Sequence, residues 1–246
     1  MNVDIKDFQY KILEIAFYFD EFCKKYDIEY YLMGGSALGA VRHHGFIPWD
    51  DDVDLLMPRP DFDKLHDLLR KGNIRPYYKL ISLQMGNSFW PFAKIIDTRT
   101  YVKNEYSNVD QHLWIDIFPM DGLPDDKEES DILLSKAEPL KKWINRCSAT
   151  IGKGKGFVRS IVKIPMILFL RMYTPERFGR KLDKLAHQYD FDKQEYIGGV
   201  AWSLGPNERM KKKEYLPYND VEFCGKKFHA PACWKFYLTQ IYGDYM

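Results

Sequence analysis

The stretch from Met33 to Met57, MGGSALGAVRHHGFIPWDDDVDLLM, contains the pattern on which the fold and the function depend. It opens with Gly34-Gly35-Ser36, between a short β-rich run at 30–33 and a segment with helical spacing. Glycines at such a step let the backbone approach a ligand closely, and the N-terminus of the next helix offers free N–H groups to a phosphate. The step therefore predicts a phosphate-binding turn, with Ser36 as the cap of the helix.

Four carboxylates follow within five positions, at Asp50, Asp51, Asp52 and Asp54, and lead directly into an apolar run. They repel one another, so the arrangement costs folding free energy unless a cation is bound. Residues two apart on a strand point to the same face, so Asp52 and Asp54 can share a metal ion while Val53 enters the core. Mg²⁺ suits such oxygen ligands and is completed by substrate phosphates and water; Mn²⁺ is the alternative ion.

A third carboxylate is expected from a neighbouring strand. The run Trp114-Ile115-Asp116-Ile117-Phe118 carries a single Asp among apolar residues, and a buried carboxylate needs a partner. We therefore predict that Asp52, Asp54 and Asp116 are the metal ligands and the catalytic carboxylates. The alternative is an acidic loop that turns in solvent or caps a helix.

The remaining pattern predicts an α/β fold with a mixed sheet flanked by helices. Apolar residues at helical spacing indicate a helix over 4–26, and Val53 to Met57 has the composition of a buried strand. Further elements are expected as a helix at 61–70, strands at 79–84, 92–96, 101–105 and 114–118, a largely helical region at 125–188, a hairpin around Cys224-Gly225-Lys226 and a C-terminal helix. The expected organisation is a catalytic core at 1–125, a helical subdomain at 126–190 and a mixed segment at 191–246 that packs on the core.

Composition restricts the class of protein and its compartment. The formal net charge is +1, so no strong field selects nucleic acid, and no nucleic-acid partner is expected. The four cysteines are scattered, and the N-terminal residues are acidic and polar rather than signal-like, which favours a cytoplasmic location. The region 152–171 combines basic residues with a short apolar run, which is typical of either a peripheral contact with the inner face of a membrane or a buried helix.

At these motifs the chain resembles the LicD family of phosphotransferases, a branch of the nucleotidyltransferase superfamily related to fukutin and fukutin-related protein. The resembling segments are YYLMGGSALGAVRHHGFIPWDDDVDLLMPRPDF, FAKIIDTRTYV, WIDIFPMDGLP and YLTQIYGDYM. The first is long and highly specific. The resemblance implies a nucleotidyltransferase-like core.

The resemblance also implies an activity. It implies transfer of phosphocholine or a similar phospho-alcohol from a CDP-linked donor, CDP-choline above all, to a hydroxyl of a cell-surface glycan precursor. That acceptor would belong to lipopolysaccharide, teichoic acid or capsule and could be lipid-linked.

The resemblance assigns residues as well. It places the Gly34–Ser36 step at the nucleotide phosphates, with Lys94 in FAKIID and Arg42 after the glycine step as cations for phosphate. Arg42 has the alternative of an ion pair with an Asp of the same loop. A choline head group would require aromatic rings, and Trp49 and Trp90 are the candidates, with packing in the core as the alternative for each.

Two other functions use the same residues. A nucleotidyltransferase acting on a nucleoside triphosphate would release pyrophosphate rather than CMP. A non-catalytic scaffold that binds a metal ion or nucleotide would be expected to lack one of the three carboxylates, and all three are present.

Overall fold

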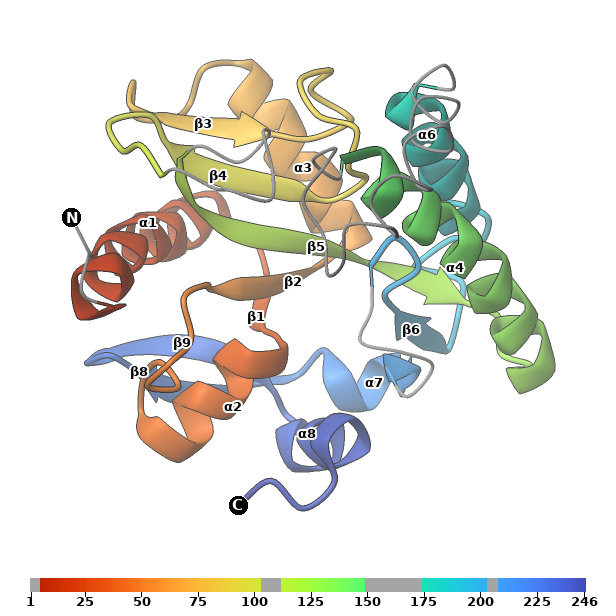
Figure 1. Cartoon of the computed structure of the whole chain (residues 1–246). Coiled ribbons are helices and arrows are strands. Elements are labelled where there is room, and N and C mark those ends of the chain that lie inside the picture. The colour runs from red at the N-terminus through yellow and green to blue at the C-terminus, as the bar shows by residue number, and fades with distance from the viewer. Residues whose placement is uncertain (1–4, 103–111, 149–173, 203–207) are drawn as a thin grey trace, which may run out of the picture.

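The computed structural model describes residues 5–102, 112–148, 174–202 and 208–246. These segments form a mixed sheet with helices around it (Figure 1). The helices are α1 (Ile5–Tyr26), α2 (Gly34–His43), α3 (Arg59–Arg70), α4 (Lys127–Ser148), α6 (Pro175–Ala186), α7 (Lys212–Tyr215) and α8 (Trp234–Tyr242). The strands are β1 (Tyr31–Leu32), β2 (Asp54–Pro58), β3 (Tyr78–Ile81), β4 (Ala93–Asp97), β5 (Leu113–Leu123), β6 (Tyr196–Gly198), β7 (Met210–Lys211), β8 (Tyr218–Phe223) and β9 (Lys226–Pro231).

The main sheet has the strand order β1-β2-β5-β4-β3, and the far part of β5 continues the sheet through β6 and β7. Strands β2 and β5 are parallel, whereas the other pairs are antiparallel. The expected α/β class with a mixed sheet is thereby confirmed. The parallel pair is the important one, because it places residues of two distant motifs in register.

The core lies where amphipathic helices cover this sheet. Helix α1 buries Ile12, Ile15 and Phe19, and its contacts with β4 and β5 fix it against the sheet. Strand β5 is buried on both faces along almost its whole length, with Ile115 and Ile117 fully buried. The period of 3.6 therefore explains which face of the helix is buried, whereas β5 is a central strand covered on both sides.

A second, smaller apolar cluster joins α4 and α6, which pack against each other beside the end of β5 (Figure 1). Its buried residues include Leu123, Leu133, Ala137, Leu182 and Ala186. The proposed boundaries at 125 and 190 remain a prediction.

Most of the elements expected in the described part of the chain are present. Helix α2 begins at Gly34, with Met33 at its N-cap and no side-chain cap hydrogen bond, so the prediction that Ser36 caps the helix was wrong. The expected strand at 101–105 falls mainly outside the described residues, and 101–102 are in no strand. The basic and apolar region 152–171 also lies outside the described residues. In the part of the chain that is described, no helix combines the length and the hydropathy needed to cross a membrane.

Candidate active site

The register between β2 and β5 brings two of the predicted carboxylates together. Asp54 and Asp116 are partners on these parallel strands, and Lys94 of β4 is the antiparallel partner of Asp116 on the other side. Residues in register on neighbouring strands point to the same face of the sheet. Asp54, Asp116 and Lys94 therefore share one face at the end where β2 begins.

Asp52 lies in the loop before the strand, near enough to Asp54 and Asp116 for the charges to interact. Strand β2 begins at Asp54, and Val53 is fully buried while its carbonyl accepts a hydrogen bond from the N–H of Asp116. Burial, together with the charges of Asp50 and Asp116, raises the pKa of Asp52 to about 7. The three predicted ligands thus interact electrostatically as one group.

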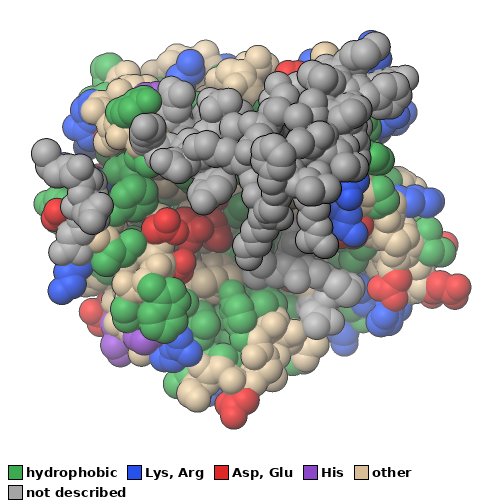
Figure 2. All heavy atoms as spheres, viewed as in Figure 1, with side chains coloured by type: hydrophobic (Ala, Val, Ile, Leu, Met, Phe, Trp, Pro, Cys, Tyr) green, Lys and Arg blue, Asp and Glu red, His purple; other side chains and the backbone are tan. Residues whose placement is uncertain are grey.

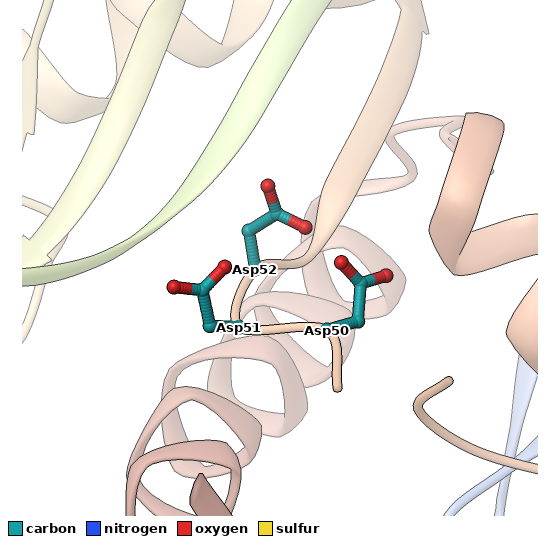
Figure 3. A group of neighbouring side chains, drawn as sticks. All are labelled: Asp50, Asp51 and Asp52. Carbon is teal, nitrogen blue, oxygen red and sulfur yellow. The ribbon is translucent and has the colours of Figure 1, made fainter. Parts of the chain in front are cut away.

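The acidic loop brings three neighbouring carboxylates close together. Among the residues that the structure describes, the carboxylates of Asp50, Asp51 and Asp52 form the group whose oxygen atoms lie within 4.8 Å of one another. Figure 3 shows the three side chains rising to the same side of the loop. In the space-filling view, acidic side chains gather near the middle of one face, over the beginning of β2 (Figure 2).

The electrostatics of the site fit a divalent cation. Burial raises the pKa of Asp54 well above its ordinary value, the charges of Asp52, Asp116 and Asp50 add to this, and Lys94 opposes it. Burial and the charge of Asp51 likewise raise the pKa of Asp50. The repulsion among the carboxylates exceeds what Lys94 offsets, since the pKa of Asp54 stays raised. The ligand atoms available are carboxylate oxygens, which Mg²⁺ and Mn²⁺ prefer. The residues present therefore fit such an ion.

Asp116 is oriented by two neighbours. The indole Nε1 of Trp114 donates a hydrogen bond to its Oδ2 at 2.7 Å, and Lys94 Nζ lies 3.4 Å from its Oδ1. The Lys94 ammonium also lies 4.2 Å from the centre of the Trp114 ring. Trp114 thus holds the carboxylate on one side while Lys94 supplies positive charge on the other.

Each residue of the Gly34–Ser36 step contacts a different element. The N–H of Gly34 donates to the hydroxyl of Tyr237 in α8 at 3.2 Å. A Cβ at Gly35 would lie 2.9 Å from Oδ2 of Asp50. The hydroxyl of Ser36 accepts a hydrogen bond from the N–H of Asp54 at 2.9 Å. The step therefore holds the acidic loop, strand β2 and helix α8 together.

The other predicted substrate-binding residues lie in different surroundings. Arg42 is exposed, and its guanidinium donates to the carbonyl of Tyr245 and to the ring of His43. Trp49 is 75% exposed beside the acidic loop. Trp90 is half-buried among aromatic rings, those of Phe89, Phe92 and Trp202. The structure thus places Lys94 at the carboxylates, Trp49 on the adjacent surface and Trp90 in an aromatic cluster, and their roles remain predictions.

Sequence reasoning missed the residues that support the site from a distance. Gln9 of α1 donates to the carbonyl of Asp50 at 2.8 Å and so fixes the acidic loop. Tyr242 of α8 lies near the same carboxylates. Burial raises the pKa of its hydroxyl, and the charges of Asp54 and Asp50 raise it as well. Tyr242 belongs to the segment YLTQIYGDYM, whose resemblance to the family pointed to α8. Gln9 belongs to none of the motifs found in the sequence.

Two comparisons with known proteins cover large parts of the chain. Residues 27–142 match the family model described as LicD/FKTN/FKRP, nucleotidyltransferase domain. Over its whole length the chain is 30% identical to the lipopolysaccharide cholinephosphotransferase LicD of Haemophilus influenzae, of which the match covers 92%.

Shorter matches point to the same group of proteins. A stretch of 28 residues, 11% of this chain and 6% of the relative, is 64% identical to the ribitol 5-phosphate transferase FKRP of human and of mouse. The extent of the first match and the family model together settle the classification: the chain is a member of the LicD family.

Proposed function

We propose that this protein, a LicD-family transferase, moves phosphocholine or a similar phospho-alcohol from a CDP-linked donor to a hydroxyl of a cell-surface glycan precursor. The relative from Haemophilus influenzae is named for choline phosphate transfer to lipopolysaccharide, and FKRP for ribitol 5-phosphate transfer. Both names describe a phosphate ester of a small alcohol as the group transferred. Lipopolysaccharide is the first choice of acceptor, with teichoic acid and capsule precursors as the others.

The observation that carries the proposal is the register of two carboxylates on neighbouring strands beside the start of α2. Asp54 and Asp116 are in register on parallel strands, and the charge of Asp52 interacts with the charges of both. Anionic diphosphates would be repelled by this group alone, so the proposal includes a divalent cation held by Asp52, Asp54 and Asp116. When bound, Mg²⁺ or Mn²⁺ supplies positive charge that neutralises the phosphates and stabilises the leaving CMP.

The protein's own residues then position and activate the reactants. Lys94 offsets negative charge on the phosphate that is attacked. We assign to Asp116 the acceptance of the proton from the acceptor hydroxyl; Trp114 fixes its Oδ2, and Lys94 near its Oδ1 keeps it ionised before the reaction. The exposed Arg42 on the last turn of α2 would serve the nucleotide end of the donor only if it exchanges its bond to the carbonyl of Tyr245.

The choline head group is assigned to an aromatic surface near the acidic loop. Trp49 is the better placed of the two candidate rings, because most of its surface is free to contact a ligand. Trp90 already packs against three other aromatic rings. A Trp49→Ala variant should therefore weaken CDP-choline binding more than a Trp90→Phe variant does.

A lipid-linked acceptor would bring the protein to the inner face of a membrane. The basic and apolar region 152–171 is the segment proposed for that peripheral contact. Flotation with vesicles that contain anionic lipid, with and without this region, tests the contact separately from catalysis.

The function is tested by incubating the protein with a panel of CDP-alcohols, Mg²⁺ and candidate glycans while CMP is measured. CMP release that depends on both the metal ion and the glycan supports the proposal. Pyrophosphate release from a nucleoside triphosphate would support nucleotidyl transfer instead. Full turnover in EDTA would refute the role of the metal ion.

A further inference from the structure

A buried tyrosine connects the C-terminal helix to the start of α2. The hydroxyl of Tyr237 accepts a hydrogen bond from the N–H of Gly34 at 3.2 Å and donates one to Oε1 of Glu208 at 3.4 Å. Tyr237 is 1% exposed, Glu208 is 6% exposed and Gly34 is buried. A hydroxyl has a single proton, so the carboxylate of Glu208 orients it and leaves the oxygen free to accept from Gly34.

The bonded N–H belongs to a backbone position that needs external support. The first N–H groups of a helix have no partner within the helix. Gly34 also has a φ of 52°, in the left-handed region that glycine adopts most readily. The bond from Tyr237 therefore satisfies a buried donor and fixes the unusual turn from which α2 starts.

The Gly34–Ser36 turn is in contact with Asp50 and Asp54. Gly35 lies against Oδ2 of Asp50, and the hydroxyl of Ser36 holds the N–H of Asp54. Both contacts lie within two residues of Gly34. A rotation of this turn would therefore displace the acidic loop and the first residue of β2 together.

The same cluster contains a matched tyrosine that lacks this connection. Tyr215 is also 1% exposed, and its ring packs edge-on against that of Tyr237 with centroids 5.6 Å apart. Within the described residues its hydroxyl has no hydrogen-bond partner. The two rings are equally buried, and the hydroxyl bonds to Gly34 and Glu208 distinguish Tyr237 from Tyr215.

We propose that Tyr237 is a positioning residue for phospho-alcohol transfer: with its proton directed to Glu208, it holds the Gly34–Ser36 turn and thereby sets the carboxylates of Asp50 and Asp54. The inference rests on the proposed function for its catalytic consequence. Its structural part is that one hydroxyl fixes the turn, and this can be tested without an activity assay.

The structural part is tested by amide hydrogen exchange at 34–36 in the full chain. Tyr237→Phe removes the acceptor of the Gly34 N–H, and loss of one such bond corresponds to about a tenfold increase in exchange rate. Tyr215→Phe removes an equally buried hydroxyl and should leave exchange at the turn unchanged. Equal exchange in wild type and both variants would overturn the inference, whether or not the enzyme is active.

The catalytic part is tested by steady-state kinetics of CMP release on the same three proteins. For Tyr237→Phe we expect kcat to fall about tenfold with the KM for the donor changed less than about twofold, because geometry rather than donor binding is affected. Tyr215→Phe should match wild type. Faster exchange with unchanged kcat would show that Tyr237 has only a structural role and would contradict the proposal. An inactive wild-type protein would refute the proposed function instead.

Discussion

The hydroxyl of Ser36 in helix α2 accepts a hydrogen bond from the backbone N–H of Asp54, the first residue of strand β2, at 2.9 Å. Ser36 is 3% exposed, so no water replaces it freely. This bond joins the helix to the strand at the point where the acidic loop enters the sheet. It gives Ser36 a role different from the helix cap that its sequence position indicates.

Ser36→Ala should therefore lower the free energy of unfolding by about 1–3 kcal/mol, because it leaves the N–H of Asp54 without its acceptor. Ser36→Thr keeps a hydroxyl and should recover part of the loss. Urea denaturation measures both, with Ser135→Ala on the exposed face of α4 as the control. Equal stabilities for Ser36→Ala and the control would contradict this role.

Two glycines of α2 should respond differently to alanine. At Gly39 a Cβ would lie 2.4 Å from the backbone oxygen of Gly45, and the backbone cannot yield cheaply. Gly39→Ala should therefore destabilise the fold by about 1–3 kcal/mol. At Gly35 the close atom is the carboxylate of Asp50, a movable side chain 2.9 Å away.

Gly35→Ala should consequently keep the stability of the wild type but lower the rate of CMP release by about ten- to hundredfold, because Asp50 is displaced. Thermal unfolding and the activity assay on both variants separate these effects. A stable and fully active Gly35→Ala protein would show that the position of Asp50 is unimportant.

The buried ion pair of Arg59 and Asp121 connects α3 to β5, with Nη2 and Oδ1 2.6 Å apart and both side chains buried. Asp121→Ala leaves a buried guanidinium uncompensated and should cost about 3–5 kcal/mol. Asp63 lies 3.8 Å from the same arginine but is mostly exposed, so Asp63→Ala should cost at most about 1 kcal/mol. Chemical denaturation that finds equal costs would show that the buried pair is dispensable.

His66 should make stability depend on pH. Burial lowers its pKa from the ordinary value of 6.5, and its ring nitrogens bond to the carbonyl of Phe62 and the hydroxyl of Ser82. The folded state thus favours the neutral ring, so the contribution is complete above pH 6.5 and is lost as the pH falls below it. Denaturation from pH 7.5 to 5 should show a steeper loss for wild type than for His66→Gln; parallel curves would exclude this effect.

The sequence was sufficient for the fold class and for the strands that carry Asp54 and Asp116, because strand composition is a local signal. Val53 and Leu55 are buried, as the two-residue alternation predicts, and Asp116 lies in an apolar strand next to Asp54. The pattern did not reveal which residues support the site. Tyr237 contacts Gly34 across 203 positions, and no local motif encodes such a pairing.

The rule for helix caps gave a wrong prediction at Ser36, because a contact with another element uses its hydroxyl. Ser36 follows two glycines and precedes a helix, which is typical of a cap, yet β2 lies close enough to use its hydroxyl. The structure also places the carboxylates of Asp50 and Asp51 within reach of Asp52, so these three form a group that competes with the predicted one.

The central claim, that Asp52, Asp54 and Asp116 hold a divalent cation, is tested most directly by titrating Mn²⁺ into the protein and following free Mn²⁺ by electron paramagnetic resonance. Wild type and Asp51→Asn should both bind the ion, because the exposed Asp51 is not one of the three ligands, whereas Asp116→Asn should bind at least about tenfold more weakly. Binding that survives in Asp116→Asn but is lost in Asp51→Asn would instead assign the ion to the loop formed by Asp50, Asp51 and Asp52.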